Sequence, residues 1–165
     1  MKKRVEEALA RIAPHIRRTE CRQAASLSNE VGGEVFLKLE NTQHSGSFKL
    51  RGLLNKILTL SDEDSQKLLV TASTGNHAAA FVHAVKVFGL RGNLFMPKTA
   101  AAVKIDNVRA SGVPFELIGE DCLEAEAHAA AFAYQHGHVW ISPYNDIEVV
   151  HGQGTVAVEL MEQLE

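Results

Sequence analysis

The central part of the sequence alternates regularly between short apolar runs and longer segments in which apolar residues recur with helical spacing. Predicted strands cover residues 68–72, 93–96, 114–118 and 138–142, and the predicted helices between them cover residues 78–88, 100–111 and 121–136. Strands that are each separated by a helix form βαβ units, in which the strands are parallel and the connections right-handed. The sequence therefore predicts an α/β fold built on a parallel sheet.

The segments on either side of this alternation are less regular. An amphipathic helix, broken near Pro14, is predicted over residues 5–16, and residues 34–40 alternate like a strand with one buried face. Helical spacing begins again at Ser47. After the last strand we expect two helices, over residues 146–151 and 155–165, joined by a Gly-Gln-Gly link.

The composition excludes several classes of protein. The chain has 165 residues, of which 45% are apolar and 22% charged, so it is too apolar for a disordered chain and long enough for one domain of common size. It contains 17 basic and 20 acidic residues, for a formal charge of -3. No basic footprint is available to neutralise phosphates, so no nucleic acid is expected as the main partner.

The expected compartment follows from the first residues and the cysteines. Glu6, Glu7 and Arg11 interrupt the apolar stretch that a secretory signal needs. No run of about eighteen apolar residues occurs, so no membrane span is predicted. Cys21 and Cys122 lie far apart, fit no metal or redox spacing, and are interpreted as free thiols of a reducing compartment. We therefore expect a cytoplasmic protein with no membrane partner.

Most other polar residues are interpreted as structural. His128, His136 and His138 lie on or just after an alanine-rich helix and lack a ligand geometry, so no metal site is predicted. Glu126 is assigned, with its acidic neighbours, to a solvated helix face. Two loops remain as candidates for chemistry.

The first is the polar turn at residues 45–52, which places Lys49 in the first turn of a helix. The positive end of a helix dipole disfavours a charged ammonium, so a lysine amine in that position could act as a nucleophile and form a Schiff base. The alternative is a solvated lysine balanced by Glu40 or Asp62. The residues alone leave both interpretations open.

The second is the loop Ser73-Thr74-Gly75-Asn76-His77, which follows a buried strand and precedes a helix. Ligands of parallel sheets bind beyond the carboxyl ends of the strands, and backbone donors at a helix N-terminus can hold a carboxylate or phosphate. The side chain of Asn76 can both donate and accept. The alternative is an ordinary βα turn in which Asn or Thr caps the helix.

Four stretches together resemble one known family. They are LKLENTQHSGSFKLRG at residues 37–52, TASTGNHAAA at 71–80, FMPKTAAAVKIDNVRASG at 95–112 and ISPYNDIEVVHGQGTVAVE at 141–159. In the same order and at similar spacing, they are similar to segments of the serine/threonine dehydratase (threonine ammonia-lyase) and serine racemase family. These are fold type II pyridoxal-phosphate enzymes, related to the tryptophan synthase β subunit, so the resemblance implies pyridoxal 5'-phosphate as the cofactor.

The resemblance assigns roles to residues of both loops. Lys49 would carry the cofactor and take the Cα proton of the substrate, Phe48 would flank the cofactor ring, and Asn76 would bind the ring hydroxyl. The pocket for the substrate carboxylate would be built by Ser73, Thr74, Gly75 and His77. Thr74 stands where the racemases carry a serine that moves a second proton, so Thr74 is a second catalytic candidate.

The implied reaction is α,β-elimination from a small hydroxyamino acid, which releases a 2-oxo acid and ammonia. Racemisation is the alternative, because the hydroxyl of Thr74 has a similar reach to that of serine but more bulk. Which hydroxyamino acid is used does not follow from the sequence.

The resemblance also implies a division of the chain. Residues 1–44 would be the N-terminal segment of a large domain, residues 45–148 a small three-layer α/β/α domain, and residues 149–165 the start of the remaining large domain. Family members are about twice as long, and their glycine-rich phosphate loop has no counterpart among these 165 residues. The expectation is a truncated, weakly active or inactive enzyme, a chain completed by a complementing chain or a homo-oligomer, or a non-catalytic module that binds a small amino acid.

The flanking segments should then expose apolar side chains to a partner. Val156, Val158, Leu160 and Met161 are the candidates.

Overall fold

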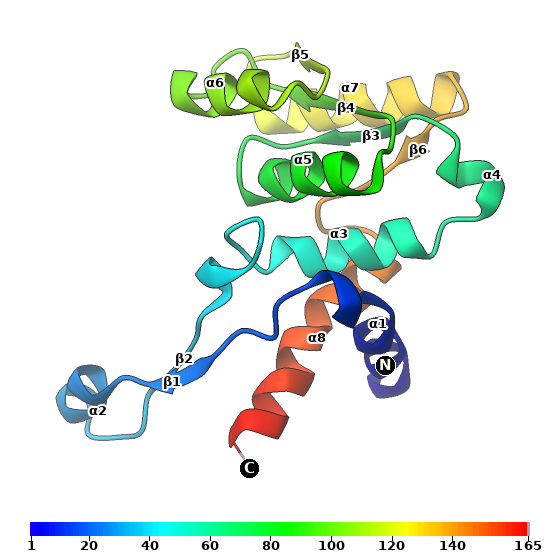
Figure 1. The fold of residues 1–165 in the computed structure, drawn as a ribbon. Coiled ribbons are helices and arrows are strands. Elements are labelled where there is room, and N and C mark those ends of the chain that lie inside the picture. Colours follow the sequence, from blue (N-terminus) through cyan, green and yellow to red (C-terminus); the bar gives the residue numbers. More distant parts are fainter. Residues whose placement is uncertain (165) are drawn as a thin grey trace.

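The computed structural model describes residues 1–164, which form a parallel sheet with its helices above a group of packed helices and a projecting arm (Figure 1). The elements are α1 (Lys2–Ile12), η1 (Ala13–His15), β1 (Cys21–Gln23), α2 (Ala25–Val31), β2 (Phe36–Lys38), η2 (Glu40–Thr42), α3 (Lys49–Leu58), α4 (Asp62–Ser65), β3 (Leu69–Ala72), α5 (Asn76–Phe88), β4 (Gly92–Met96), α6 (Ala102–Ser111), β5 (Phe115–Leu117), α7 (Cys122–Gln135), β6 (Val139–Trp140) and α8 (Ile147–Leu164).

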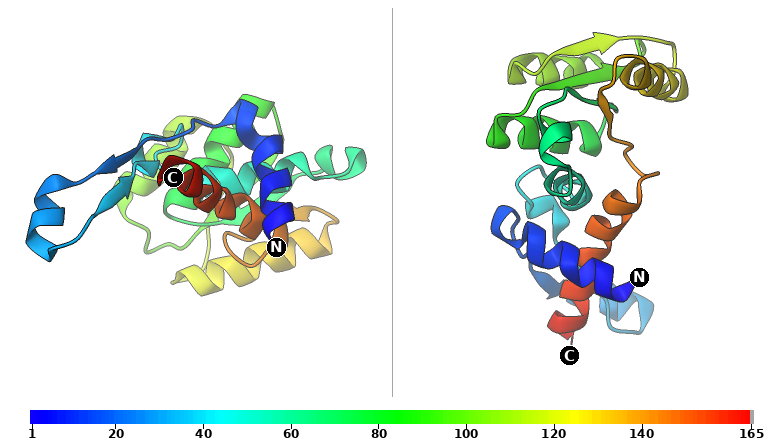
Figure 2. Two further views of the ribbon diagram at one scale, coloured as in Figure 1. Left: turned by 90° about the horizontal axis from the view of Figure 1, so that it is seen from below. Right: turned by 90° about the vertical axis from the view of Figure 1, so that its right-hand side faces the viewer.

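The central sheet is parallel and has the strand order β5-β4-β3-β6. Its inner strand β3 is buried along its whole length. Alternate side chains of a strand point to opposite faces, and here Leu69 packs with α5 and α6 whereas Val70 packs with α7. The result is the α/β fold with a parallel sheet and helices on both faces that the alternating sequence predicted (Figure 2).

The alanine-rich helix α7 covers its face of the sheet closely. Ala125, Ala129 and Ala133 recur every four residues, form one side of the helix, and are almost completely buried against Val70 and Phe95. Small side chains let this helix lie low on the strands. The segment therefore forms a packed layer on the sheet, in which His128 is exposed.

Helix α3 lies between the sheet layer and the lower helices, with α5 on one side and α1 and α8 on the other. It crosses α8 at backbone contact. A Cβ added at Gly52 would lie 2.6 Å from the Val149 carbonyl oxygen, and one added at Gly152 would lie 2.5 Å from the Arg51 carbonyl oxygen. The Gly-Gln-Gly segment is thus part of one continuous helix, and the predicted link between two helices was wrong. Glycine is needed there for close approach and does not interrupt the helix.

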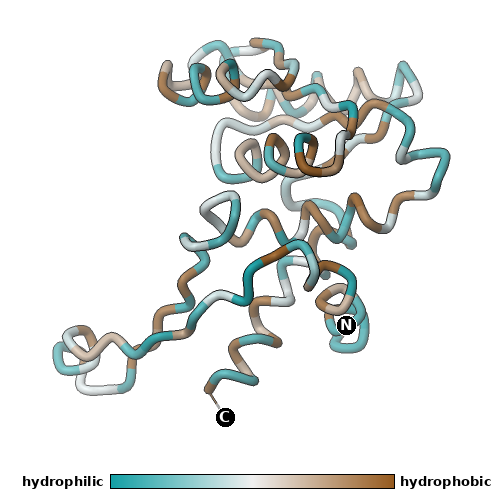
Figure 3. The backbone as a smooth tube through the Cα atoms, in the orientation of Figure 1, coloured by the Kyte–Doolittle hydropathy of each residue, from teal (hydrophilic) through white to brown (hydrophobic). Residues whose placement is uncertain are grey.

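The arm formed by β1, α2 and β2 projects from the rest of the chain (Figure 1). Its two strands pair antiparallel, with Cys21 opposite Lys38. The predicted strand forms as β2, but its predicted buried face was wrong, because Phe36 is 40% exposed and Leu37 is 43% exposed. Hydrophobic residues alternate with hydrophilic ones along the arm (Figure 3), and Phe36 and Leu37 among them are exposed.

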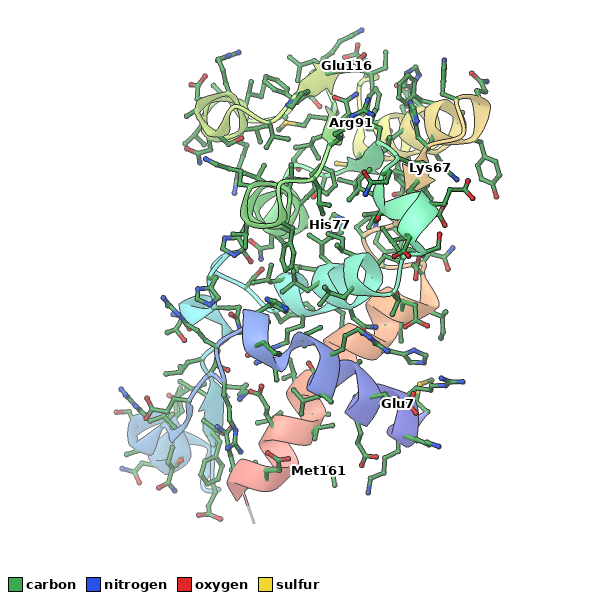
Figure 4. All side chains as sticks on the ribbon, turned by 45° about the vertical axis from the view of Figure 1, so that its right-hand side comes forward. Glu7, Lys67, His77, Arg91, Glu116 and Met161 are labelled. Atoms are coloured by element: carbon green, nitrogen blue, oxygen red, sulfur yellow. The ribbon has the colours of Figure 1, made fainter. Side chains whose placement is uncertain are left out.

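The prediction of exposed apolar side chains on the last helix holds in part. Met161 is 57% exposed and lies at the outer side of α8 (Figure 4). Val156, Val158 and Leu160 are only half-exposed. Glu165, the last residue of the predicted helix, lies outside the described residues. The division of the chain into domains at residues 44 and 148 stays a prediction.

Within residues 1–164, no helix combines the length and the apolar character needed to cross a bilayer. In the same part of the chain, no group of three or more His, Cys, Asp or Glu side chains could hold a metal ion.

Candidate active site

A cavity of about 370 Å³ opens at the carboxyl ends of the parallel strands. Segments that are far apart in the sequence meet here: the start of α3, the loop between β3 and α5, the start of α7, and the segment between β6 and α8. The lining residues are Lys49, Ala72, Ser73, Thr74, Asn76, His77, Pro97, Cys122, Leu123, Ala125, Glu126, Pro143 and Tyr144. The position is the one that the general rule for parallel sheets predicts.

The two candidate loops come together in this cavity. Lys49, Thr74 and Asn76 all line it, together with Ser73 and His77. Two residues with predicted roles lie beside it. Phe48 is 40% exposed, and its ring centroid is 5.4 Å from the Lys49 Nζ. Gly75 is the N-cap of α5 and lines a smaller hollow on the other side of the loop.

Lys49 is the first residue of α3, as predicted. Its Nζ donates a hydrogen bond to the Pro143 carbonyl oxygen at 3.2 Å. The alternative in which Glu40 balances Lys49 does not describe this structure, because the carboxylate of Glu40 accepts hydrogen bonds from Arg51 at 2.7 and 2.9 Å. Lys49 therefore faces the cavity with a neutral carbonyl as its partner.

The loop before α5 leaves the start of that helix open. The Ser73 Oγ accepts a hydrogen bond from the Gly75 N–H at 3.2 Å, which closes a tight turn. Helix α5 has no side-chain cap, so the predicted alternative of an Asn or Thr cap is not what forms. Uncapped N–H groups at a helix start are donors for an anion, and here they lie next to the cavity.

His77 lies in the first turn of α5 and is only 3% exposed (Figure 4). Its Nε2 is 3.0 Å from the Thr71 Oγ1. Burial, and after it the positive charge of Lys49, lowers the pKa of His77 to about 3. The imidazole is therefore uncharged at neutral pH, and Lys49 is the cationic side chain of this wall.

Among the lining residues that were not predicted, three carry side chains with chemical function. Glu126, which the sequence assigned to a solvated face, lines the cavity and accepts a hydrogen bond from the Tyr144 hydroxyl. This bond raises the pKa of Tyr144 above its usual value. Cys122 lies at the start of α7 on the same wall and is a free thiol. Only the position of these residues in the sequence could have indicated them: Tyr144 follows the predicted strand at residues 138–142, and α7 follows the predicted strand at residues 114–118.

On the opposite side of α3, Arg51 is completely buried in a network of charges. It donates to Glu159 at 2.7 and 2.9 Å and to Glu40. Lys38 joins through the second carboxylate oxygen of Glu159 at 2.5 Å. Two positive and two negative side chains cancel, and the network ties α3 to α8 and to the base of the arm.

The match to known proteins agrees with this geometry. Residues 12–165 match the family described as pyridoxal-phosphate dependent enzymes. The chain belongs to this family. Its cofactor, pyridoxal phosphate, is the one that the four motifs implied, and the family resemblance drawn from them is confirmed.

Individual members of the family are similar to this chain in sequence and in structure. The chain is 40% identical to the L-threonine ammonia-lyase of Thermotoga maritima over 162 residues, which are 97% of this chain and 40% of that protein. Among solved structures, the processed threonine deaminase isoform 2 of Solanum lycopersicum gives a TM-score of 0.91 at 34% identity, over 99% of this chain and 46% of that one. The serine racemase of Dictyostelium discoideum gives 0.88 at 34% identity, over 99% and 53%. The chain thus spans about half the length of these relatives or less.

Proposed function

We propose that the protein takes part in a pyridoxal-phosphate-dependent α,β-elimination from a small hydroxyamino acid, with Lys49 as the residue that bonds to the cofactor aldehyde. One observation carries the proposal: the Lys49 amine, the polar loop at residues 73–77 and the uncapped start of α5 line one cavity. The likeness to a threonine ammonia-lyase supports the reaction class.

The residues present fit the aldehyde and ring side of the cofactor. A primary amine stands in the cavity, and Asn76 beside it offers a side-chain amide for the ring hydroxyl. The ring of Phe48 lies close to Lys49, at the edge of the cavity. When bound, the cofactor supplies an electron sink for the charge that develops at the substrate Cα.

The protein groups would then orient the substrate and move its proton. We assign the substrate carboxylate to the uncapped N–H groups of α5 and to the hydroxyls of Ser73 and Thr74, because these are donors at a helix start. The Nζ of Lys49 is the base for the Cα proton. The Pro143 carbonyl holds this Nζ at 3.2 Å and so fixes the direction from which it acts.

Racemisation is the second candidate function. The hydroxyl-bearing Thr74 lines the same cavity as Lys49, and the likeness to a serine racemase supports this candidate. A racemase would convert L-serine to D-serine, which chiral chromatography of the reaction mixture detects. A lyase would release pyruvate from serine without D-serine.

The partner and the compartment are further proposals. The exposed apolar side chains of the arm and of α8 support contact with a complementing chain or with a second copy, and the division at residues 44 and 148 goes with it. Size-exclusion chromatography tests the contact with a second chain, and limited proteolysis tests the division into domains.

The two free thiols support a reducing, cytoplasmic location, which cell fractionation tests.

Titration of the protein with pyridoxal 5'-phosphate tests the main proposal. The wild-type chain should develop the absorbance band of lysine-bound cofactor, and Lys49→Ala should not. Lys86→Ala is the matched control, since Lys86 is an exposed lysine on α5 outside the cavity. A band that persists in Lys49→Ala refutes the assignment of Lys49. A band without formation of 2-oxo acid from serine or threonine leaves binding without catalysis, which is the non-catalytic amino-acid-binding alternative.

A further inference from the structure

Thr71, a completely buried residue of β3, makes two hydrogen bonds beneath the cavity. Its Oγ1 is 2.7 Å from the Ile141 carbonyl oxygen and 3.0 Å from the His77 Nε2. A threonine hydroxyl has one proton, and a carbonyl oxygen only accepts. The proton of Thr71 therefore goes to Ile141, so that the His77 Nε2 must be the donor of the other bond.

This direction of bonding fixes the tautomer of His77. A ring that is uncharged and carries its proton on Nε2 has a bare lone pair on Nδ1. In the structure, Nδ1 is buried and has no hydrogen-bond partner, as expected of a nitrogen without a proton to donate. The ring of His77 thus cannot bind a carboxylate through Nδ1, and its contribution to an anion is its backbone N–H.

The Thr71 hydroxyl contacts two segments that lie near Lys49, namely the start of α5 and the segment after β6. Ile141 lies two positions before Pro143, whose carbonyl oxygen accepts from the Lys49 Nζ. His77 belongs to α5, the helix whose open start faces the cavity. Thr71 therefore joins β3, α5 and the segment after β6 at one point.

We propose that Thr71 is a positioning residue of this site: its hydroxyl accepts from the His77 Nε2–H, so that it holds the ring in the Nε2–H tautomer, and it fixes the segment that carries the acceptor of Lys49. The proposal rests on the function proposed for Lys49. The bond to Thr71 holds the His77 ring against β3 at the start of α5. The fixed carbonyl keeps the Lys49 amine pointed into the cavity.

Nitrogen-15 NMR of the histidine rings tests the first half without any cofactor. In the wild type, the His77 signals, assigned by their loss in His77→Gln, should show a protonated Nε2 and an unprotonated Nδ1 at neutral pH. In Thr71→Val, which keeps the shape and removes the hydroxyl, the other tautomer should gain population. Thr71→Ser should restore the wild-type signals. A wild-type ring that is charged or protonated on Nδ1 overturns the proposal, whether or not Thr71→Val folds.

The rate at which Lys49 bonds to pyridoxal 5'-phosphate tests the second half. We expect Thr71→Val to react about tenfold more slowly, a factor that equals about 1.4 kcal/mol, the size of one net hydrogen bond. Thr71→Ser should recover most of the rate. Thr59→Val is the matched control, because Thr59 also donates to a main-chain carbonyl but lies at the far end of α3.

The outcomes separate the two proposals. An unchanged rate and unchanged tautomer in a folded Thr71→Val refute the role of Thr71. If the wild type forms no cofactor band at all, the function proposed for Lys49 fails, while the NMR result still decides the state of His77.

Discussion

Lys49 and Arg51 are two cations in the first turn of one helix, and they lie in opposite environments. Arg51 is completely buried, with two carboxylates as partners, whereas the Lys49 Nζ has a main-chain carbonyl and an open cavity. The carboxylate of Glu159 shows how firmly Arg51 is held. Burial alone would raise its pKa, but the hydrogen bonds from Arg51 and Lys38 outweigh burial and lower it.

The two environments give the two side chains different roles: Arg51 stabilises the fold, and Lys49 is free to contact a ligand. A cation with satisfied hydrogen bonds fixes the helix, and a cation without a charged partner remains available to a ligand. Because residues two positions apart in a helix point to different sides, one turn can do both. The start of α3 is thus fixed by Arg51 on the side of α8, and Lys49 on the other side of the helix faces the cavity.

The largest expected effect comes from removing the held cation. Arg51→Ala leaves Glu159 and Glu40 without their main partner, and breaking a buried ion pair in this way costs about 3–5 kcal/mol of unfolding free energy. Urea denaturation followed by circular dichroism measures it. Glu162 lies on α8, as Glu159 does, and Glu162→Gln removes only its exposed pair with Arg18, so this variant should cost at most about 1 kcal/mol. Equal losses in the two variants would show that the buried network does not carry the stability assigned to it.

The crossing of α3 and α8 should give the next effect. Gly52→Ala places a Cβ 2.6 Å from the Val149 carbonyl oxygen, which is backbone and cannot move aside. We expect a loss of about 1–3 kcal/mol, typical of overpacking, measured by the same denaturation. In the control Gly154→Ala, the new Cβ meets the Val5 side chain at 3.1 Å, so a smaller change should follow. A stabilised Gly52→Ala would contradict the close crossing.

The lowered pKa of His77 should make the free energy of unfolding depend on pH. The pKa of His77 is about 3 in the folded chain and 6.5 as its ordinary value, so the unfolded chain binds the extra proton between these two pH values. Stability should therefore fall as the pH drops from 6.5 toward 3, by up to about 1.4 kcal/mol per pH unit from this residue. Denaturation at several pH values should give a shallower slope for His77→Gln. Parallel slopes would mean that His77 titrates alike in both states.

The sequence predicted the parts of this structure that depend on local pattern. The strands at residues 68–72 and 93–96 were found because a buried parallel strand is a short apolar run between helices. The loop at residues 73–77 followed, since its place after a strand defines the carboxyl edge of the sheet. These are properties of neighbours in the chain.

Other features depend on contacts between distant segments and left no local signal. Gly152 looks like a helix break until α3 is seen to cross α8 there. Glu126 looks like a solvated acid until Tyr144, eighteen residues later, is seen to donate to it. Residues 34–40 alternate like a half-buried strand, but Phe36 and Leu37 at its centre remain exposed. Only tertiary packing decides such cases.

The smallest expected effect on stability belongs to Lys49 itself and sharpens the comparison. Lys49→Ala removes one hydrogen bond to a carbonyl beside an open cavity, so its unfolding free energy should stay within about 0.5 kcal/mol of the wild type. The same variant should lose the cofactor band completely. Arg51→Ala should instead lose much of its unfolding free energy. A Lys49→Ala variant as destabilised as Arg51→Ala would mean that both cations support the fold, and the division between a held and an available side chain would be lost.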